Sequence, residues 1–361
     1  MGVEPTNGEE DDARVMLEWL RRHTAKSVDR PVTDADIGRL REAGELNALL
    51  VGLRQAEQQS RDSGDTHGVI LALGSQSQVA MEQGRLDDAL RLLSQVESLC
   101  RSSGAGWELQ RALGQTVLIH ASKDDFRALA PPAEERVLLC RELDDDVALQ
   151  DALAAIGLLR MQAGEYKRAL AMFVEQERLC IKLGDDATLA TCLGNQAMVQ
   201  RHLEDTLQAG TLIARQEEIC RRLGDSMGLH RALGNRAVLL QHAGDTAGAL
   251  TLYREKEAIC RRIKDVRGLT FALNNAATIM QLEGDFESAL EHHREVEKMS
   301  RAGQYAETLA MSLGNQGAIL NHIDRVKEAI PKYEEAIRVA RANGLDALTR
   351  TMAEQFKEVQ E

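Results

Sequence analysis

Four asparagines at one position of an internal repeat are the residues of this sequence best suited to hold a ligand. They recur at a constant interval, at Asn195, Asn235, Asn275 and Asn315. A primary amide offers two hydrogen-bond donors and an acceptor, so a row of amides can bind the N–H and C=O groups of a peptide whatever its side chains. The alternative is that each asparagine fixes a neighbouring helix by a structural hydrogen bond, because asparagine within a helix is not there for its propensity.

The earlier repeats have other residues at this position, namely Ser75, Gln115 and Ala155. This difference predicts that the binding stretch lies in the C-terminal half. Further polar residues flank the asparagines on the same predicted face, six or seven positions after them and, in one case, four positions before. They would give a groove polar, partly basic walls: Arg201, His202, Arg231, Gln241, His242 and His322.

The line of histidines raises the question of a metal site. Stacked helices lie roughly 8–10 Å apart, whereas zinc–nitrogen bonds are about 2 Å long. One site would need side chains from two helices to converge, together with further ligands that the pattern does not identify. We therefore interpret the histidines as lining of the groove, and we predict neither a metal nor a cofactor.

The cysteines and the missing motifs argue against catalysis. Five of the six cysteines share one repeat position near the predicted end of a second helix, and Cys192 takes a small-residue position. A disulfide needs Cα atoms within about 7 Å, so we predict free, buried, apolar side chains. The sequence contains no P-loop, GxGxxG, HExxH, CxxC or GxSxG pattern, and we expect no catalytic residues. The five cysteines that share one repeat position are Cys100, Cys140, Cys180, Cys220 and Cys260.

All of these positions belong to one long repeat that runs through most of the chain. Leucines mark it at the same interval as the asparagines, from Leu73 to Leu313. Eleven positions after the leucine, four units have a glycine, and an Ala-Leu pair follows the glycine. Several markers that stay in register over this length establish an internal repeat with a period of about 40 residues. The glycines are Gly84, Gly164, Gly244 and Gly284.

Each unit is predicted to be a pair of helices. Between Ser226 and Ile263, apolar and small residues recur at helical spacings in two stretches that Gly244-Asp245 separates. Glycine permits the left-handed conformation that ends a helix, and the aspartate can cap the next helix. Such a pair cannot bury its apolar faces alone and must stack on its neighbours. The sequence therefore predicts an all-α fold, a right-handed α-solenoid.

The array is predicted to hold about eight stacked helix-turn-helix repeats in residues 31–342. The flanking segments are expected to be a disordered acidic tail at 1–12, an N-terminal capping helix at 13–30 and a C-terminal capping helix at 343–361. The outer face of the last helix is charged, as the end of a solenoid requires.

One unit departs from the pattern. Asp124 replaces the turn glycine, and Pro131-Pro132 falls inside the expected second helix, where proline removes a hydrogen bond and clashes with the preceding turn. The unit is either a decayed repeat with a shortened second helix or a bend that divides the array into two stiff halves.

The repeat resembles the tetratricopeptide repeat superfamily. Leu233 matches the large residue near the start of that motif, Ala237 the small residue four positions on, Gly244-Asp245 the turn, and Tyr253 the aromatic residue of the second helix. The period is longer than the usual one of about 34 residues, as in the long-repeat branch that includes kinesin light chains and bacterial signalling proteins. The resemblance implies that the asparagine position faces a concave groove.

Composition narrows the class of partner. The formal net charge is -13, and aromatic residues make up 3% of the chain. An acidic surface with few rings is unsuited to phosphate backbones and to base stacking, so we expect no nucleic acid. No apolar run is long enough for a membrane helix, and no signal peptide is visible. These features predict a cytoplasmic protein without a membrane partner.

The sequence as a whole predicts a non-catalytic scaffold that holds a protein or peptide partner in the groove of the solenoid. The alternative is a sensor or regulatory subunit of a larger signalling assembly, in which ligand binding changes the curvature of the solenoid.

Overall fold

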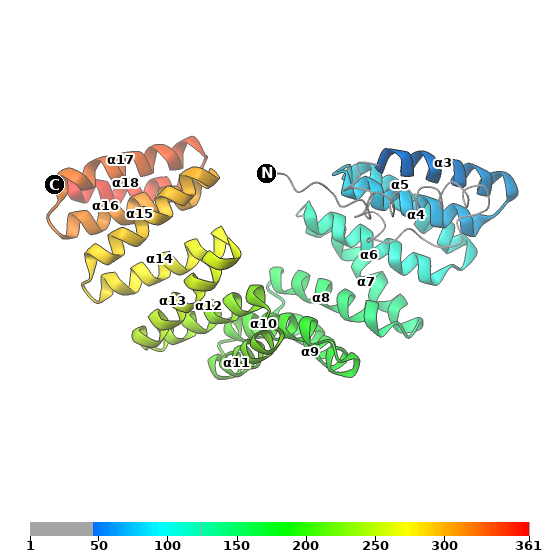
Figure 1. Ribbon diagram of the computed structural model, residues 1–361, viewed down its shortest axis with the longest axis horizontal. Helices are drawn as coiled ribbons and strands as arrows, with labels where there is room; N and C mark the ends of the chain where they lie inside the picture. The colour runs from blue at the N-terminus through cyan, green and yellow to red at the C-terminus, as the bar shows by residue number, and fades with distance from the viewer. Residues whose placement is uncertain (1–45, 124, 361) are drawn as a thin grey trace, which may run out of the picture. The chain divides into compact units, whose positions relative to one another are not determined.

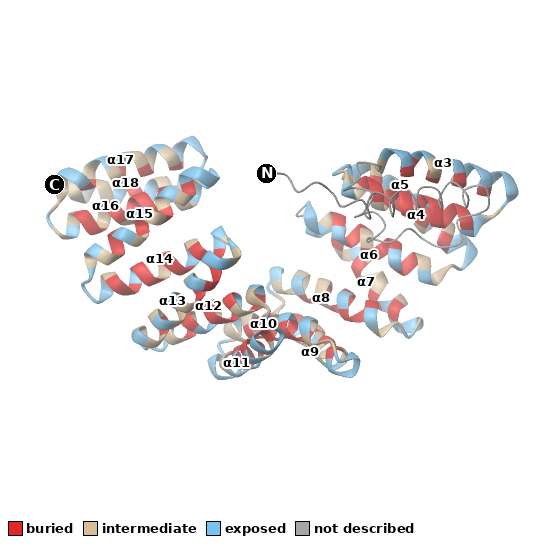
Figure 2. Cartoon of the chain, viewed as in Figure 1, coloured by how far each residue is buried: buried red, intermediate tan, exposed pale blue. Residues whose placement is uncertain are grey.

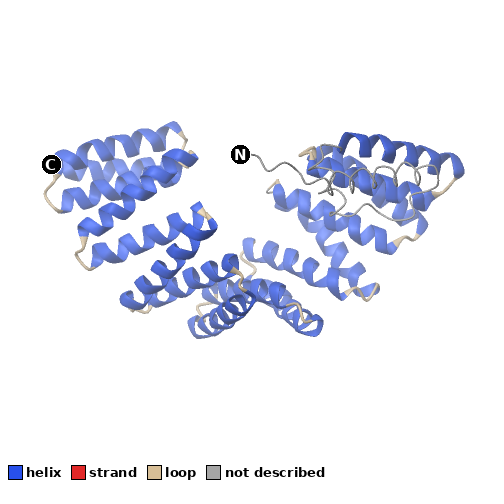
Figure 3. Cartoon of the chain, in the orientation of Figure 1, coloured by secondary structure: helices blue, strands red, loops and turns tan. Residues whose placement is uncertain are grey.

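The computed structural model describes residues 46–123 and 125–360, and every element in these ranges is an α-helix (Figures 1 and 3). None of the described helices is both long and apolar enough to span a bilayer. In chain order the helices are α3 (Leu46–Ser63), α4 (Thr66–Glu82), α5 (Leu86–Ser103), α6 (Gly106–Ser122), α7 (Phe126–Glu142), α8 (Asp146–Gln162), α9 (Tyr166–Leu183), α10 (Asp186–His202), α11 (Thr206–Leu223), α12 (Ser226–His242), α13 (Thr246–Ile263), α14 (Val266–Leu282), α15 (Phe286–Gly303), α16 (Ala306–His322), α17 (Val326–Ala342) and α18 (Asp346–Gln360).

The predicted solenoid of paired helices is confirmed. The chain divides after Leu183 into two compact units, and within each unit every helix packs on the next one in the chain. First helices of successive repeats also touch each other, as α4 touches α6 and α12 touches α14. The first helices therefore form the inner row of the stack in each unit.

The ends of the helices follow the turn chemistry that the sequence predicts. Gly84 and Gly164 have φ values of 71° and 74°, which lie in the left-handed region that glycine enters without a steric cost. Asp245 caps α13, because its carboxylate accepts a hydrogen bond of 2.8 Å from the backbone N–H of Gly248. These turns set the two helices of a repeat side by side.

The core follows the repeat (Figure 2). The marker leucines at the repeat interval, from Leu73 to Leu313, are all buried. A glycine or small residue follows most of them, and at Gly194 an added Cβ would lie 2.6 Å from Nε2 of Gln216 in the second helix of the same repeat. The glycines in the helices thus allow close packing, as the sequence predicts.

Ion pairs join the second helices of successive repeats. An arginine directly after the repeat cysteine position contacts a glutamate in the second helix of the next repeat, for example Arg101 with Glu135 at 2.9 Å. Each pair is half-exposed, so each contributes only about 0–1 kcal/mol. In one repeat the sequence has Ile181 at the position of the arginine, and in the next repeat it has Arg215 at the position of the glutamate. Besides Arg101–Glu135, the ion pairs between successive second helices are Arg141–Glu175, Arg221–Glu255, Arg261–Glu295 and Arg301–Glu335.

Pro131-Pro132 neither shortens its helix appreciably nor divides the array. Both prolines lie inside α7, which has 17 residues, compared with 18 in α9. Pro331 occupies the same repeat position inside α17. Pro131 and Pro331 are exposed, so water can satisfy the carbonyls that they leave without a helical partner. The division between the units falls after Leu183 instead.

Of the segments predicted to flank the array, the structure describes only the C-terminal one. The tail at 1–12, the capping helix at 13–30 and Asp124 lie outside the described residues. At the C-terminus, α18 fills the segment predicted as a capping helix and packs on α16 and α17. Met352 of α18 is buried, so this helix takes the place of the first helix of a further repeat.

Candidate functional site

The four asparagines occupy equivalent positions on the first helices of the second unit. They lie on α10, α12, α14 and α16, and each is partly exposed. We call the exposed residues of these four helices the asparagine face. Because first helices form the inner row, the amides follow one another along the inner side of the unit.

The structural alternative for the asparagines finds no support in their contacts. Asn275 donates a hydrogen bond of 2.8 Å to the carbonyl of Phe271 in its own helix. Within the described residues, the side chains of Asn195, Asn235 and Asn315 make no hydrogen bond. None of the four fixes a neighbouring helix, so most of their hydrogen-bonding capacity faces solvent.

The position four residues before each asparagine is exposed and varies from repeat to repeat. Its residues, which we call the variable line, are Thr191, Arg231, Phe271 and Met311. Phe271 and Met311 are 42% and 45% exposed, so two large apolar side chains of this line can contact a ligand. The variable line combines a hydroxyl, a cation and two apolar side chains next to a constant row of amides.

The predicted walls of the groove are only partly on this face. His202, His242 and His322 are exposed, and the ring of His322 lies 4.6 Å from the ring of Phe286. Arg231 is exposed, and its Nε donates to the carbonyl of Met227 at 3.2 Å.

Arg201 and Gln241 are less open. Both are half-buried, and Oε1 of Gln241 accepts a hydrogen bond of 3.2 Å from the hydroxyl of Tyr253 in the second helix of its own repeat. Gln241 therefore serves the packing of a repeat at least as much as the open face.

Of the variable line, the prediction from the sequence includes Arg231 but not Thr191, Phe271 or Met311. The signal was present, because a position that changes within a strict repeat is free of the demands of packing.

A hollow in the first unit lies over the same repeat positions. It measures about 630 Å³ and is lined by residues of α4, α6, α7 and α8, among them Gln78, Arg111, Gln115 and Asp151. The position equivalent to the asparagines holds Gln115 and Ala155 here, and both contact the hollow. The asparagine pattern predicts binding in the C-terminal half, whereas this hollow lies in the first unit.

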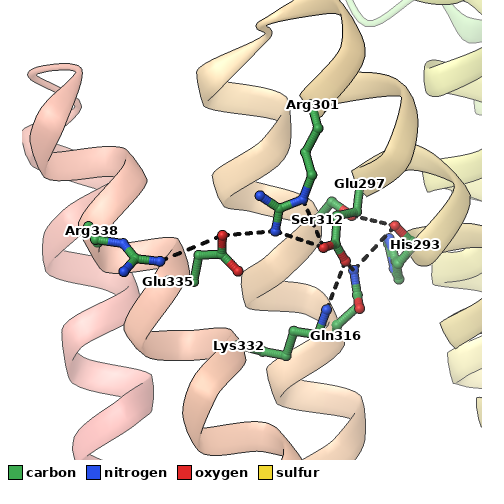
Figure 4. A network of polar contacts seen from close by, with 8 residues as sticks. All are labelled: His293, Glu297, Arg301, Ser312, Gln316, Lys332, Glu335 and Arg338. Carbon is green, nitrogen blue, oxygen red and sulfur yellow. Dashed lines mark hydrogen bonds and ion pairs between the residues drawn. The ribbon is translucent and has the colours of Figure 1, made fainter.

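A network of polar contacts in α15–α17 gathers titratable groups around Glu297, and its contacts indicate a structural role (Figure 4). Glu297 accepts hydrogen bonds of 2.8 Å from Nε2 of Gln316 and from Nζ of Lys332, and it also pairs with Arg301. Although burial opposes ionisation, these donors lower the pKa of Glu297 to about 2. A carboxylate this acidic stays ionised at neutral pH and is a poor general base.

His293 completes this network. Its carbonyl accepts a hydrogen bond of 2.6 Å from the hydroxyl of Ser312, and its ring lies 3.1 Å from Nε2 of Gln281. Burial, followed by the neighbouring His292, lowers the pKa of His293 to about 4. The imidazole is therefore neutral at physiological pH, and the cluster contributes packing rather than proton transfer.

Comparison with known proteins fits this geometry. A model of the tetratricopeptide repeat matches residues 228–302, which span most of α12, all of α13 and α14, and most of α15. Together with the paired helices of the solenoid, this match shows that the chain contains tetratricopeptide-like repeats. A model of anaphase-promoting complex subunit 5 matches residues 278–354, and no curated protein sequence matches the chain.

Three solved structures share the tetratricopeptide-repeat fold with this chain at low sequence identity. A STAND signal-transduction ATPase with a tetratricopeptide repeat sensor, from Pyrococcus horikoshii, is 11% identical with a TM-score of 0.66, over 96% of this chain and 55% of that one. The apo quorum sensor NprR from B. thuringiensis is 13% identical with a TM-score of 0.61, over 92% and 97%. A Rap protein complexed with competence and sporulation factor is 11% identical with a TM-score of 0.54, over 97% and 98%. This chain thus spans about half the length of the STAND protein.

Proposed function

We propose that this protein is a scaffold that holds a peptide, or an extended segment of a partner protein, on the asparagine face of its second unit. The observation that carries the proposal is the row of Asn195, Asn235, Asn275 and Asn315, which repeats through four helices without bonding to a neighbouring helix. A row of amides that the fold does not use is suited to bind the backbone of a ligand.

The spacing of the row fits an extended chain. Neighbouring first helices lie roughly 8–10 Å apart, and an extended peptide advances about 3.3 Å per residue. Each asparagine would therefore meet every third residue, and its amide would donate to the C=O and accept from the N–H of that residue. Each such hydrogen bond contributes a net 0.5–1.5 kcal/mol, roughly. The eight hydrogen bonds of the four asparagines sum to roughly 4–12 kcal/mol before the cost of association is subtracted. Micromolar affinity, which needs about 8 kcal/mol net, therefore requires side-chain contacts as well.

The variable line would supply those contacts and the selectivity. Phe271 and Met311 offer apolar contact area, and Arg231 offers a charged donor for a carboxylate. We expect the preferred segment to carry two apolar side chains about three residues apart and an acidic residue about three residues to one side of them.

A second candidate function, a sensor or regulatory unit, has its own support. Two of the structurally similar proteins are a sensor-bearing ATPase and a quorum sensor, and the chain divides into two compact units. In this proposal, occupancy of the asparagine face changes how the units move together. Labels placed on α5 and α15 would change their separation when a ligand binds to a sensor and would not change it in a simple scaffold.

The experiment that tests the proposal is a selection of peptides from a random library displayed against the purified chain. The selected peptides are then measured on a variant with all four asparagines changed to alanine. A control variant carries Ser75→Ala and Gln115→Ala, at the same repeat position of the first unit. We expect the asparagine variant to lose affinity at least tenfold and the control to keep it. Equal binding by the two variants would assign the asparagines no part in binding.

A further inference from the structure

Three side chains that can ligate a metal converge between α12, α13 and α14. They are His230 of α12, Cys260 near the end of α13 and Asp265 at the start of α14, and one ligand atom of each lies within 4.8 Å of the others. His230 and Cys260 are buried, and the side chain of Asp265 is 21% exposed. This convergence does not involve the line of exposed histidines considered in the sequence.

The equivalent place in an earlier repeat shows what the fold alone requires. There, Gln110 takes the position of His230, and its Nε2 donates to Asp145 at 3.1 Å, while Cys140 lies 3.8 Å from its Oε1. The contact between repeats at Gln110 is therefore an ordinary hydrogen-bonded one. In the later repeat an imidazole replaces the amide, and the same cysteine and aspartate remain.

Two observations distinguish the contact around His230 from the equivalent contact around Gln110. Nε2 of His230 is buried without a hydrogen-bond partner in the described structure, although it lies 3.4 Å from Oδ2 of Asp265. Asp265 makes no side-chain cap hydrogen bond to α14, whereas Asp145 caps α8 through the backbone N–H of Ala148. The side chains of His230 and Asp265 thus both leave a ligand atom directed at their shared space.

We propose that His230, Cys260 and Asp265 form a zinc site that joins two repeats of the second unit. The 3.4 Å between Nε2 and Oδ2 matches the edge of a tetrahedron whose metal–ligand bonds are about 2.1 Å long. A thiolate and an imidazole together favour Zn²⁺ over Mg²⁺ or Ca²⁺. A water that enters on the side of Asp265 would complete the tetrahedron.

Lys256 supports the ring of His230 from the other side. Its Nζ lies 3.0 Å from Nδ1 of His230 and donates to the carbonyl of the same residue at 3.0 Å. Without metal, the ammonium of Lys256 donates to Nδ1, so the ring carries its proton on Nε2. When Zn²⁺ binds, Nε2 and the thiol of Cys260 each release a proton to solvent, and Lys256 passes one proton to Nδ1. Zn²⁺, the thiolate, the carboxylate, the neutral ring and the neutral amine then sum to zero charge in the buried site.

The site lies directly behind the asparagine face. Nζ of Lys256 lies 5.2 Å from the centroid of the Phe271 ring, and Phe271 belongs to the variable line. The zinc site would therefore fix the floor of that face, although it does not depend on what the face binds.

The test is a titration of the full chain, stripped of metal, with Co²⁺ and then Zn²⁺. We expect one equivalent of Co²⁺ to give the thiolate-to-cobalt charge-transfer band, Zn²⁺ to displace it, and about two protons to be released per ion in calorimetry repeated across buffers. Cys260→Ser copies Ser300 and His230→Gln copies Gln110, so both variants have precedents in this fold. Each should abolish the band and weaken Zn²⁺ binding at least about tenfold.

Two further variants keep the result unambiguous. Cys140→Ser changes the equivalent cysteine and should leave the band and the affinity intact. Lys256→Gln, which copies Gln216, should keep the band and weaken Zn²⁺ binding by about 10–100-fold. The proposal is overturned if the wild type gives no charge-transfer band, if the band survives Cys260→Ser, or if Cys140→Ser removes it equally.

Discussion

The buried His293 makes the second unit sensitive to acid. This side chain is fully buried at the repeat position that holds Tyr253 one repeat earlier and Tyr333 one repeat later. Its pKa falls from 6.5 to about 4, because burial disfavours the charged ring and His292 lies beside it. Since the unfolded chain takes up a proton on this ring and the folded chain does not, stability present above pH 6.5 is lost as the pH falls toward 4.

The size of the effect follows from the two pKa values. Between pH 7.5 and pH 5, a single histidine with pKa 6.5 unfolded and about 4 folded lowers the free energy of unfolding by about 2 kcal/mol. A loss of this size is a large part of the stability of a small unit.

His293→Tyr should remove this loss. Tyr253 shows how a tyrosine fits, because its hydroxyl donates to Gln241 at 3.2 Å and Gln281 takes the equivalent place beside His293. The assay is hydrogen exchange in α15 and α16 of the full chain, measured at pH 7.5, 6 and 5 and corrected for the intrinsic exchange rate. We expect the wild type to lose about 2 kcal/mol more of its opening free energy over this range than the variant.

Two results would refute this reasoning. One is an imidazole of His293 that titrates near 6.5 in the folded chain, observed by NMR of histidine-labelled protein. The other is an equal loss of opening free energy in the wild type and in His293→Tyr.

Three further predictions concern packing and polar contacts. Glu297→Gln should cost about 2–3 kcal/mol of unfolding free energy, because Lys332 and Arg301 lose the charge of a half-buried partner and Gln316 loses an acceptor. Glu257→Gln should cost at most about 1 kcal/mol, since Glu257 forms its ion pair with Arg261 of its own helix. Urea denaturation compares the two variants, and equal costs would contradict the network. Gly74→Ala should stabilise the first unit by about 0.5–1 kcal/mol, because no atom lies within 4 Å of the added Cβ. Gly157→Ala should destabilise it by about 1–3 kcal/mol, because the Cβ would lie 2.5 Å from the ring of Phe173. A lower melting temperature for Gly74→Ala than for Gly157→Ala would be incompatible with this packing. Pro131→Ala should raise the free energy of unfolding by about 1 kcal/mol or more by restoring a helical N–H, and an unchanged melting temperature would show that the helix has already adapted.

Much of the fold could be predicted because its signals are local. The range Ser226–Ile263 was predicted from glycine, aspartate and apolar spacing, and α12 begins at Ser226 and α13 ends at Ile263. The division after Leu183 carries no local signal of comparable strength. Pro131-Pro132 marks α7 as irregular in the sequence. The helix continues because Pro131 is exposed, so water can satisfy the carbonyl that it leaves without a helical partner.

The candidate sites were harder to predict because they depend on which residues meet. The asparagine row was visible as a period, but whether each amide is used by the fold depends on hydrogen bonds that only the structure shows. The convergence of His230, Cys260 and Asp265 joins three helices without any motif spacing. Cys260 is indeed buried and free, as predicted, yet its neighbours give it a chemistry that its four counterparts lack.

The most direct test of the proposed binding mode is a double-mutant cycle between Asn275 and the backbone of a selected peptide. The peptide is made with one N–H replaced by an ester oxygen, at each position in turn, and each form is measured on the wild type and on Asn275→Ala. If the asparagine binds the backbone, one ester position should cost about 1 kcal/mol on the wild type and nothing further on the variant. If every ester lowers the binding free energy equally on the wild type and on Asn275→Ala, the asparagines do not bind the peptide backbone and the central claim is wrong.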